Sequence, residues 1–580
     1  MASLQQKTVN GYKYWYIVEG RRINGKPTPV VLQYLGTADN LLKRLNQRNK
    51  SMQLKSYSHG DIAALLSIAH KLDVPSIINK HIHSSRDYFS EKPIRNNLTA
   101  GATFLLGAIG RTCMLTSKRG WYNWAKTTSL EYLLRVNLSK INSQHFWDLM
   151  DALPEKSIPK VEEDLLKKVM NVFDIKSDTL FFDTTNFYTY IATSNTHCTI
   201  AQRGKNKQKR SDLRQVGMAL VVTREDLIPL FHHSYRGNMN DTVVFKTVIR
   251  SIKQRIINLG LDINNHTFVF DRGNNSIANL EIVKKLELFY VGALTPYHHM
   301  ELTVTALKNL KAIKVDRDEI TSYRTKTKIW DEERTIIAFI SEKLKSGQIR
   351  GIYQMIEKKM GKLHELQEKL SNPKSKKRSR KQITEQINNI LKTERANRLI
   401  CWDLQWESKG RYRLIYAMNQ KEIDKLEENF GVRILMTNRH DWSTKDIVKA
   451  FYGQSNVEKA FKELKNPFHM SVKPQYHWTD QKIKVHNLIC VIGFLLSTLT
   501  WWEVRRKTDY KGCMNTLFNT LKNIKLGSVL EKNEKNGRLR ADYKLEMMDV
   551  DEQKLFDCME LMDFHTNTNR QKFKCFSIYN

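Results

Sequence analysis

A change of periodicity between residue 177 and about residue 294 restricts the fold of this chain more than any other feature. Three runs rich in aromatic and β-branched residues come first, and such runs predict strands. A helix, a strand, a second helix and another strand follow, and this order predicts a mixed sheet with helices on its faces. In order, the segments are "DTLFFDTTNFYTYIA", "QVGMALVVT", "LIPLFHHSYRG", "DTVVFKTVIRSIKQRIINLG", "HTFVFDRGN", "SIANLEIVKKL" and "LFYVGALT".

The remaining chain predicts several further units, since 580 residues are too many for one ordinary core. Leu488–Trp502 is the longest apolar run, and it is short for a membrane span, so it predicts a buried helix. The expected units are a β-hairpin region (1–50), a helical, candidate DNA-binding domain (51–170), an α/β domain (171–300 with 430–505), an insertion (301–429) and a basic C-terminal region (506–580).

The charge balance predicts a polyanionic partner. Lys and Arg number 95 against 60 Asp and Glu, a formal charge of +35. Such a charge favours nucleic acid ahead of a membrane surface. The seven cysteines form no CxxC pair and no zinc spacing, and the N-terminus lacks a signal-peptide core. We therefore expect reduced thiols and a cytoplasmic protein.

Two regions carry basic residues at the tips of predicted hairpins. The Asn24-Gly25 turn predicts a β-hairpin with Arg21, Arg22 and Lys26 at its tip. A packing flange and a DNA-contacting arm explain this hairpin equally well. Apolar residues at 3–4 spacing over 342–398 predict an antiparallel helical hairpin. A solvated arm, contact with a partner subunit and DNA contact all explain the charge at its tip, and we favour DNA contact. The tip residues are Lys374, Lys376, Lys377, Arg378 and Arg380.

Two further basic segments are weaker candidates for DNA contact. The loop 203–214 is either a solvated loop or a DNA-backbone contact made by Lys205, Lys207, Lys209 and Arg210. The helical segment 477–486 offers Lys482, Lys484 and His486, with DNA contact and a structural role equally favoured. The pairs His232-His233 and His298-His299 are interpreted as structural.

Three carboxylates predict a metal site. Asp183 lies in an apolar strand, Asp271 follows the buried "FVF", and Glu458 lies on the predicted helix "AFYGQSNVEKAFKELK". Carboxylates from two strands and a later helix can meet at one sheet edge, where oxygen donors select Mg²⁺ or Mn²⁺. Two such ions can act on a phosphodiester. Each acid taken singly is also explained as a strand-end cap or a surface ion pair.

Several motifs in a fixed order resemble bacterial insertion-sequence transposases of the DDE type, in the IS-four superfamily and its IS-sixteen-thirty-four branch. The resemblance covers roughly residues 1–500. Its motifs are "NGKPTPVVLQYLG", "SQHFWDLMDAL", "FFDTTNFYTY", "SDLRQVGMALVVT", "IPLFHHSYRGNMNDTVVF", "FVFDRGNNS", "VEKAFKELK" and "PQYHWTDQKIKVHNLICVIGFLL".

The resemblance implies a ribonuclease-H-like catalytic domain in which Asp183, Asp271 and Glu458 hold two Mg²⁺ ions, or Mn²⁺. The family signature on the helix of the catalytic Glu is Tyr, two residues, Arg, three residues, Glu, six residues, Lys. Here Phe451 and Gln454 replace the Tyr and the Arg, whereas Glu458 and Lys465 match. The DNA contacts expected near the scissile bond are those of Lys465, Lys462, Gln454, Tyr452 and Arg272.

The function implied by the resemblance is cut-and-paste transposition. A metal-activated water would cleave at a transposon end, and the released 3′-hydroxyl would join target DNA. The partners implied are terminal inverted repeats, target DNA and a second copy of the chain in a synaptic homodimer, at the nucleoid of a bacterial cytoplasm. The alternatives are a non-catalytic DNA-binding protein derived from a transposase and a metal-dependent nuclease without strand transfer.

Overall fold

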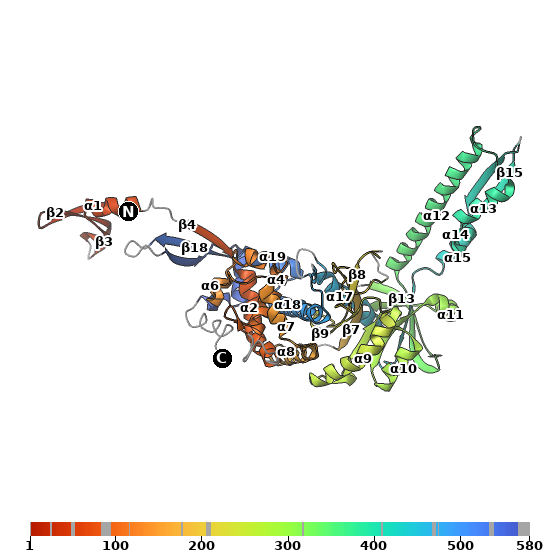
Figure 1. Ribbon diagram of the computed structural model, residues 1–580, viewed down its shortest axis with the longest axis horizontal. Coiled ribbons are helices and arrows are strands. Elements are labelled where there is room, and N and C mark those ends of the chain that lie inside the picture. The colour runs from red at the N-terminus through yellow and green to blue at the C-terminus, as the bar shows by residue number, and fades with distance from the viewer. Residues whose placement is uncertain are drawn as a thin grey trace.

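The computed structural model places a helical body at the centre of the molecule, between an N-terminal sheet at one end and a projecting arm at the other (Figure 1). A large mixed sheet lies between the body and the arm. The structure describes residues 2–23, 26–47, 53–82, 94–114, 117–175, 178–204, 210–315, 318–407, 410–466, 471–473, 475–532 and 539–565.

The large sheet has nine strands in the order β12-β13-β14-β17-β11-β10-β7-β8-β9. Strands β7, β8 and β9 form an antiparallel meander, and β10 and β11 continue parallel to β7. The predicted order of strands and helices is confirmed, as is a mixed sheet flanked by helices. The elements are β7 (Thr179–Thr189), β8 (Arg214–Thr223), β9 (Pro229–Arg236), α9 (Asp241–Asn258), β10 (Thr267–Phe270), α10 (Ile277–Lys285) and β11 (Phe289–Leu294).

The sheet continues into a part of the chain that the sequence placed in the insertion. Strand β17 pairs antiparallel with β11 on one side and with β14 on the other. Ile336, Ile337 and Phe339 of β14 are fully buried, because this strand is internal to the sheet. The elements added from the insertion are α11 (Met300–Lys308), β12 (Lys311–Val315), β13 (Asp318–Ile329) and β14 (Glu332–Ile340). Strand β17 (Val432–Thr437), which joins them to β11, lies in the segment that the sequence assigned to the α/β domain.

The projecting arm has a hydrophobic core of its own. Its first two helices form the predicted antiparallel hairpin, since Lys359 of α12 donates to the carbonyl of Ile390 at the far end of α13. Ser379 begins α13 with a capping box. The elements are α12 (Glu342–Ser371), α13 (Arg380–Ile390), α14 (Glu394–Leu399), β15 (Ile400–Trp406), β16 (Tyr412–Met418) and α15 (Gln420–Glu427).

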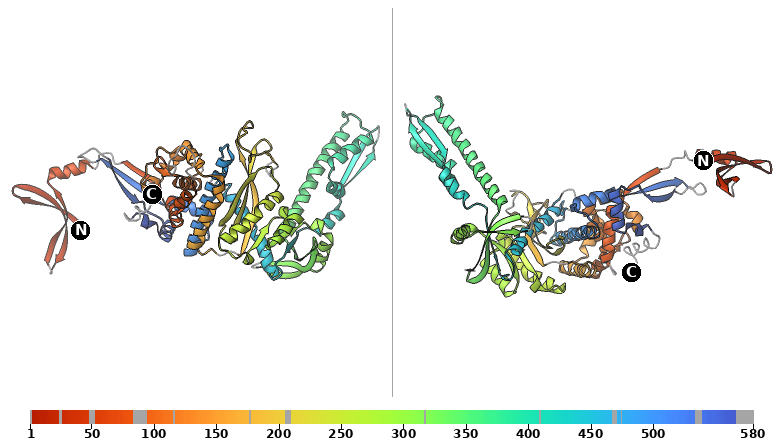
Figure 2. Two further views of the ribbon diagram at one scale, coloured as in Figure 1. Left: turned by 60° about the horizontal axis from the view of Figure 1, so that its bottom comes forward. Right: turned by 180° about the vertical axis from the view of Figure 1, so that it is seen from behind.

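The helical body is built around α18 (Asp480–Lys507), which packs against the other helices of the body and, on another side, against the large sheet (Figure 2). This helix alone among the described residues is long and apolar enough to cross a membrane, and nearly all of that stretch is buried inside the protein. The prediction of a buried helix over Leu488–Trp502 is therefore confirmed. The helices around it include α2 (Gly60–Leu72), α3 (Val74–Lys80), α4 (Ala100–Cys113), α5 (Trp121–Ala125), α6 (Leu130–Leu134), α7 (Ser143–Asp151) and α8 (Ile158–Val172).

The C-terminal region packs onto this helical body and pairs with a strand from the N-terminal part of the chain. Its strand β18 pairs with β4, which lies more than 450 residues earlier in the chain, and with β19. The elements are β4 (Gln53–Ser58), β5 (Ile94–Arg95), β6 (Leu98–Thr99), α19 (Met514–Asn523), β18 (Lys525–Lys532), β19 (Leu539–Leu545) and α20 (Val550–Cys558).

The N-terminal hairpin is present and has a third strand. Strand β2 (Tyr12–Ile23) pairs with β3 (Lys26–Gly36) and also with β1 (Ala2–Val9), which the sequence did not predict. Ile23 pairs with Lys26, and Asn24-Gly25 between them lie outside the described residues. Helix α1 (Ala38–Gln47) follows β3.

Candidate active site

Asp183 and Asp271 are brought together by the parallel pairing of β7 and β10. Phe181 pairs with Val269 and Phe182 with Phe270, and the next residues of the two strands are the two aspartates. Adjacent strands lie about 4.8 Å apart, so the two acidic positions are neighbours. Asp183 is half-buried and Asp271 is exposed, at the point where β10 ends.

The two faces of β7 have different neighbours. Phe182 packs against Phe245 of α9, with ring centroids 5.2 Å apart. Thr184 donates a hydrogen bond of 2.6 Å to Asp241, the first residue of α9. Since strand residues alternate between faces, Asp183 lies on the face opposite α9.

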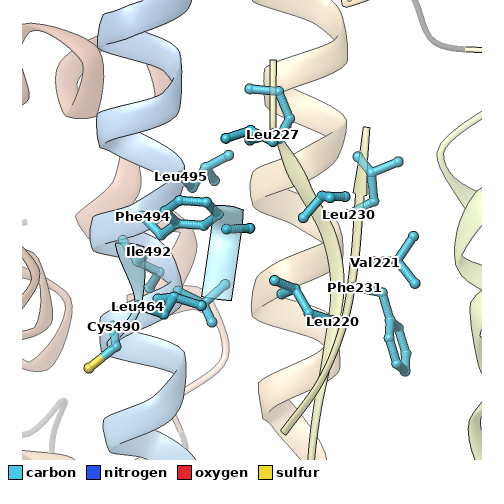
Figure 3. Packing of buried hydrophobic residues seen from close by; sticks show 14 of the residues in the cluster. Leu220, Val221, Leu227, Leu230, Phe231, Leu464, Cys490, Ile492, Phe494 and Leu495 are labelled. Carbon is cyan, nitrogen blue, oxygen red and sulfur yellow. The ribbon is translucent and has the colours of Figure 1, made fainter. Parts of the chain in front are cut away.

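Helices α16 (Thr444–Gly453) and α17 (Ser455–Glu463) cover that opposite face. A Cβ added at Gly453 would lie 2.4 Å from the ring of Phe181, so α16 ends in close contact with β7. On this same face, four residues after Phe181, the hydroxyl of Thr185 accepts a hydrogen bond from the ammonium of Lys465. Figure 3 shows Leu464 packed beside Ile492 and Phe494 of α18, which fixes the end of this segment on the body.

The stretch expected to be one helix is broken at Gln454. Its N–H bonds to the carbonyl of Phe451, three residues earlier, instead of continuing the α-helical ladder. The close contact of Gly453 with β7 accompanies this break. The expectation of a single continuous helix over 450–465 is therefore wrong, and α17 is a separate helix of nine residues.

Glu458 lies on the flank of α17 that faces β7. Asn456 donates to the carbonyl of Arg224, just after β8, which places its flank of the helix toward β8. Glu458 is two residues, or about 200° of helix, from Asn456, and seven residues, about two turns, before Lys465. By this spacing, Glu458 lies on the same side of the segment as Lys465, whose ammonium reaches Thr185. The side chain of Glu458 is exposed.

The three acids are not gathered into one ligand set. Within the described part of the chain, no group of three or more His, Cys, Asp or Glu side chains lies close enough to hold a metal ion. The two aspartates supply the hard oxygen donors that Mg²⁺ and Mn²⁺ prefer. Their sequence neighbours, "FFDTT" and "VFDRGN", contain no Cys or His. The two neighbouring aspartates thus fit such an ion as two of its ligands.

The remaining residues of the signature helix have distinct surroundings. Lys465 is exposed and also lies 5.4 Å from the ring centroid of Phe187. Lys462 is exposed one turn before it. Gln454 is half-buried at the helix break, and Tyr452 is exposed with its ring edge against Phe339 of β14.

Phe451, at the tyrosine position of the signature, is buried. The guanidinium of Arg433 on β17 lies 5.4 Å from the centroid of its ring. A hydrophobic ring suits this enclosed position.

Several residues predicted to contact DNA lie outside the described part of the chain or next to its limits. Lys205, Lys207 and Lys209 lie outside the described residues, as does the side chain of Arg272, whose backbone forms a 3-10 turn. Arg210 is described and exposed. It makes two hydrogen bonds to Asp212, of 2.8 and 2.7 Å, which lower the pKa of that carboxyl to about 2.

The prediction that Lys482 contacts DNA is wrong. Lys482 is 2% exposed, donates to the carbonyl of Trp147 and lies 3.2 Å from a carboxylate oxygen of Asp151. The first turn of α18 packs against α7, so the lysine serves the packing of the body. Lys484 is half-buried and paired with Glu155.

The arm tip keeps most of its predicted charge at the surface. Lys376 and Lys377 are exposed, whereas Arg378 is half-buried and donates to Gln386 of α13. The sequence missed Arg411, which donates to the carbonyls of Leu370, Asn372 and Pro373 and so caps the end of α12.

A buried basic cluster beside α18 was also missed. The ammonium of Lys118 lies 3.2 Å from a ring nitrogen of His477 and 3.2 Å from one of His486. Burial and the nearby Arg111 lower the pKa of Lys118 to about 7. The sequence signal was the pair of histidines nine residues apart around "WTDQKIKV", a segment for which DNA contact and a structural role were equally favoured.

Comparisons with known proteins identify no family for this chain. No family model matches it, and no curated protein sequence matches it. Among solved structures, it is similar to piggyBac transposase in a synaptic complex with hairpin DNA, with 10% sequence identity over 79% of each chain and a TM-score of 0.35. A TM-score this low does not establish a common fold.

Proposed function

We propose that this protein is a DNA transposase of the DDE type, related to the IS-four superfamily and its IS-sixteen-thirty-four branch. The observation that carries the proposal is the pairing of β7 with β10, which puts Asp183 beside Asp271 under the face that α16 and α17 cover. The position of Glu458 on the flank of α17 toward β7 supports its role as the third acid.

The sheet topology supports a ribonuclease-H-like catalytic core. Strands β7, β8 and β9 form an antiparallel meander. On the other side of β7 lie β10 and then β11, both parallel to β7. Helices α9 and α10 connect these last strands in sequence. In this proposal the arm and strands β12–β14 are insertions at the edge of that core.

Asp183, Asp271 and Glu458 are the residues that would hold two Mg²⁺ or Mn²⁺ ions. Such ions, when bound, supply stabilisation of the negative charge that develops at the attacked phosphodiester. Thr185 holds the Lys465 ammonium against β7, two residues beyond Asp183 on the same face, where it binds and orients a DNA phosphate. Lys462 adds a second positive charge on the exposed side of α17.

The substrates in this proposal are terminal inverted repeats and target DNA, bound by a synaptic homodimer at the bacterial nucleoid. The net charge of +35 and the exposed Lys376 and Lys377 support a polyanionic partner.

The proposal is tested with the purified protein, Mg²⁺ and duplex DNA that carries the terminal inverted repeats flanking its own gene. We expect end cleavage and joining to a target, both lost in Glu458→Gln and both retained in Glu281→Gln, an exposed glutamate on α10. Binding without cleavage would favour a non-catalytic DNA-binding protein. Nicking without joining would favour a nuclease, and cleavage unchanged by Glu458→Gln would overturn the role of that residue.

A further inference from the structure

Three large aromatic side chains are exposed together beyond the end of β7. Tyr190 follows the strand and is 60% exposed, and Tyr476 and Trp478, in the segment before α18, are 61% and 44% exposed. Aromatic rings of this size are usually buried for most of their area. Their exposure at one place indicates a surface that binds something flat and apolar.

The rings are already arranged for stacking. Tyr190 and Tyr476 lie with centroids 6.1 Å apart and planes at 29°. Trp478 is stacked on Trp147 of α7, with centroids 5.2 Å apart and planes at 22°, and His197 meets its ring edge-on. Each exposed ring is thus supported from one side, which lowers the entropy cost of binding a ligand on the other.

The segments that carry the rings are fixed to each other. The carboxylate of Asp480, in the first turn of α18, accepts hydrogen bonds from the N–H groups of Thr199 and Ile200 and from the Thr199 hydroxyl. These contacts tie the loop after β7 to the start of α18, directly beside Trp478. The surface is therefore built into the fold.

Positive charge accompanies the rings. The ammonium of Lys473 lies 4.4 Å from the ring centroid of Tyr188, the last tyrosine within β7. Burial and then the positive charge of Arg210 lower the pKa of Lys473. An aromatic surface flanked by cations has the chemistry of a site for unpaired nucleic acid, with phosphates on the cations and bases on the rings.

The position of the surface connects it to the proposed active site. Tyr190 is seven residues beyond Asp183, a distance of about 23 Å along an extended strand. Lys465 lies over Thr185 and Phe187, on the face of β7 that carries Asp183. Tyr188, beneath Lys473, faces the other side of the strand, so a DNA strand would reach the rings around the end of β7.

We propose that Tyr190, Tyr476 and Trp478 form a stacking surface, at the end of β7, for the bases of an unpaired DNA strand that extends beyond the active site. This inference rests on the proposed function for its substrate. A protein partner would also cover exposed rings, but the flanking cations and the overall charge fit a DNA backbone better. A stacked base typically changes affinity by about 5- to 150-fold.

The test compares three DNA ligands by fluorescence anisotropy at fixed salt concentration. They are a blunt end duplex, the same duplex with a single-stranded extension of about ten nucleotides, and that extension with abasic sites in place of its bases. The abasic ligand keeps every phosphate, so the difference between the two extensions isolates base stacking. We expect the wild type to prefer the base-containing extension by about tenfold.

The variants are chosen so that each removes one property. Tyr476→Ala and Tyr190→Ala should abolish the preference for bases, and Tyr476→Phe should retain it because the ring is kept. Tyr297→Ala removes a tyrosine that is 77% exposed at another site and should change nothing. Matching thermal unfolding of all variants would show that the effect is not a loss of folding.

Two results would overturn the inference. One is equal affinity of the wild type for the base-containing and abasic extensions, and the other is an unchanged preference in Tyr190→Ala and Tyr476→Ala. Cleavage of the blunt end duplex in the presence of Mg²⁺ is measured in parallel. Loss of the base preference with cleavage intact would refute only the stacking surface, whereas base preference without any cleavage would refute the proposed function and leave the surface supported.

Discussion

Asp183 and Asp271 are neighbours because the residues before them, Phe182 and Phe270, are partners in the parallel pairing of β7 and β10. A shift of this pairing by one residue would turn one acid to the face that α9 covers. The buried aromatic residues before each aspartate hold the register, since Phe182 packs on α9 and Phe270 stacks near Tyr290 of β11.

Replacing either aspartate by asparagine should remove cleavage. Asp183→Asn and Asp271→Asn keep the shape of the side chain but lose the charge that a divalent cation needs, so the cleavage rate should fall by about 100-fold or more. Gel analysis of cut end DNA measures the rate, and anisotropy measures binding, which should persist. Asp551→Asn, which removes an exposed carboxylate on α20, is the matched control, and a cleavage loss of the same size in this control would contradict the specific role.

Lys465 should contribute one phosphate contact. Lys465→Ala should weaken end binding and lower the slope of log affinity against log salt by about 1, because one fewer counterion is released. Lys465→Arg keeps the charge and should preserve the slope. Lys554→Ala, at an exposed lysine of α20, should leave the slope unchanged, and an unchanged slope in Lys465→Ala would show that this ammonium binds only Thr185.

Gly453→Ala should destabilise the protein through Phe181. The new methyl group would lie 2.4 Å from the ring, so the helix or the ring must move, at a cost of about 1–3 kcal/mol in the free energy of unfolding. Urea unfolding measures this cost, and cleavage should fall as α17 is displaced. Phe181→Leu should recover part of the loss in the double variant, as a double-mutant cycle would show.

The control for this prediction is Gly361→Ala on α12, where an added Cβ meets no atom within 4 Å. There alanine should raise helix stability by up to about 1 kcal/mol. Equal stability of Gly453→Ala and the wild type would mean that α16 does not press on β7.

Lys118 should make stability depend on pH above neutrality. Burial and Arg111 lower its pKa to about 7 in the folded state, from an ordinary value of 10.5. Between these values the unfolded chain binds one more proton than the folded one, so stability rises with pH, by about 1.4 kcal/mol per pH unit at most. Below pH 7 the lysine is charged in both states and contributes no further dependence.

Melting temperatures between pH 7 and pH 9 test this prediction. The wild type should gain stability over this range relative to Lys118→Met, which has no titratable group at this position. Lys140→Met, at an exposed lysine, should behave as the wild type. Parallel pH profiles for the wild type and Lys118→Met would show that the buried ammonium does not titrate in this range.

Much of the α/β region could be predicted from the sequence, because its signals are local. Alternating and β-branched runs mark strands whatever they pair with, so β7 to β11 and the helices between them were predicted in order. The same holds for the arm, where apolar spacing along α12 and α13 records a hairpin that packs mainly on itself. The positions of the two aspartates along their strands follow from the same local signal, whereas their adjacency depends on the pairing of β7 with β10.

The sequence alone thus determined the order of the elements and the positions of the acids along it, because period and residue type are properties of short segments. Tertiary structure decided the rest: that β12 to β14 join the main sheet, that α18 is enclosed by helices from both ends of the chain, and that Lys482 is buried rather than exposed. It also decided that the signature helix breaks at Gln454 and that Tyr190 and Tyr476 meet. These outcomes depend on contacts between residues up to several hundred positions apart, and burial of a polar side chain is set by the partner that covers it, which no short stretch of sequence contains.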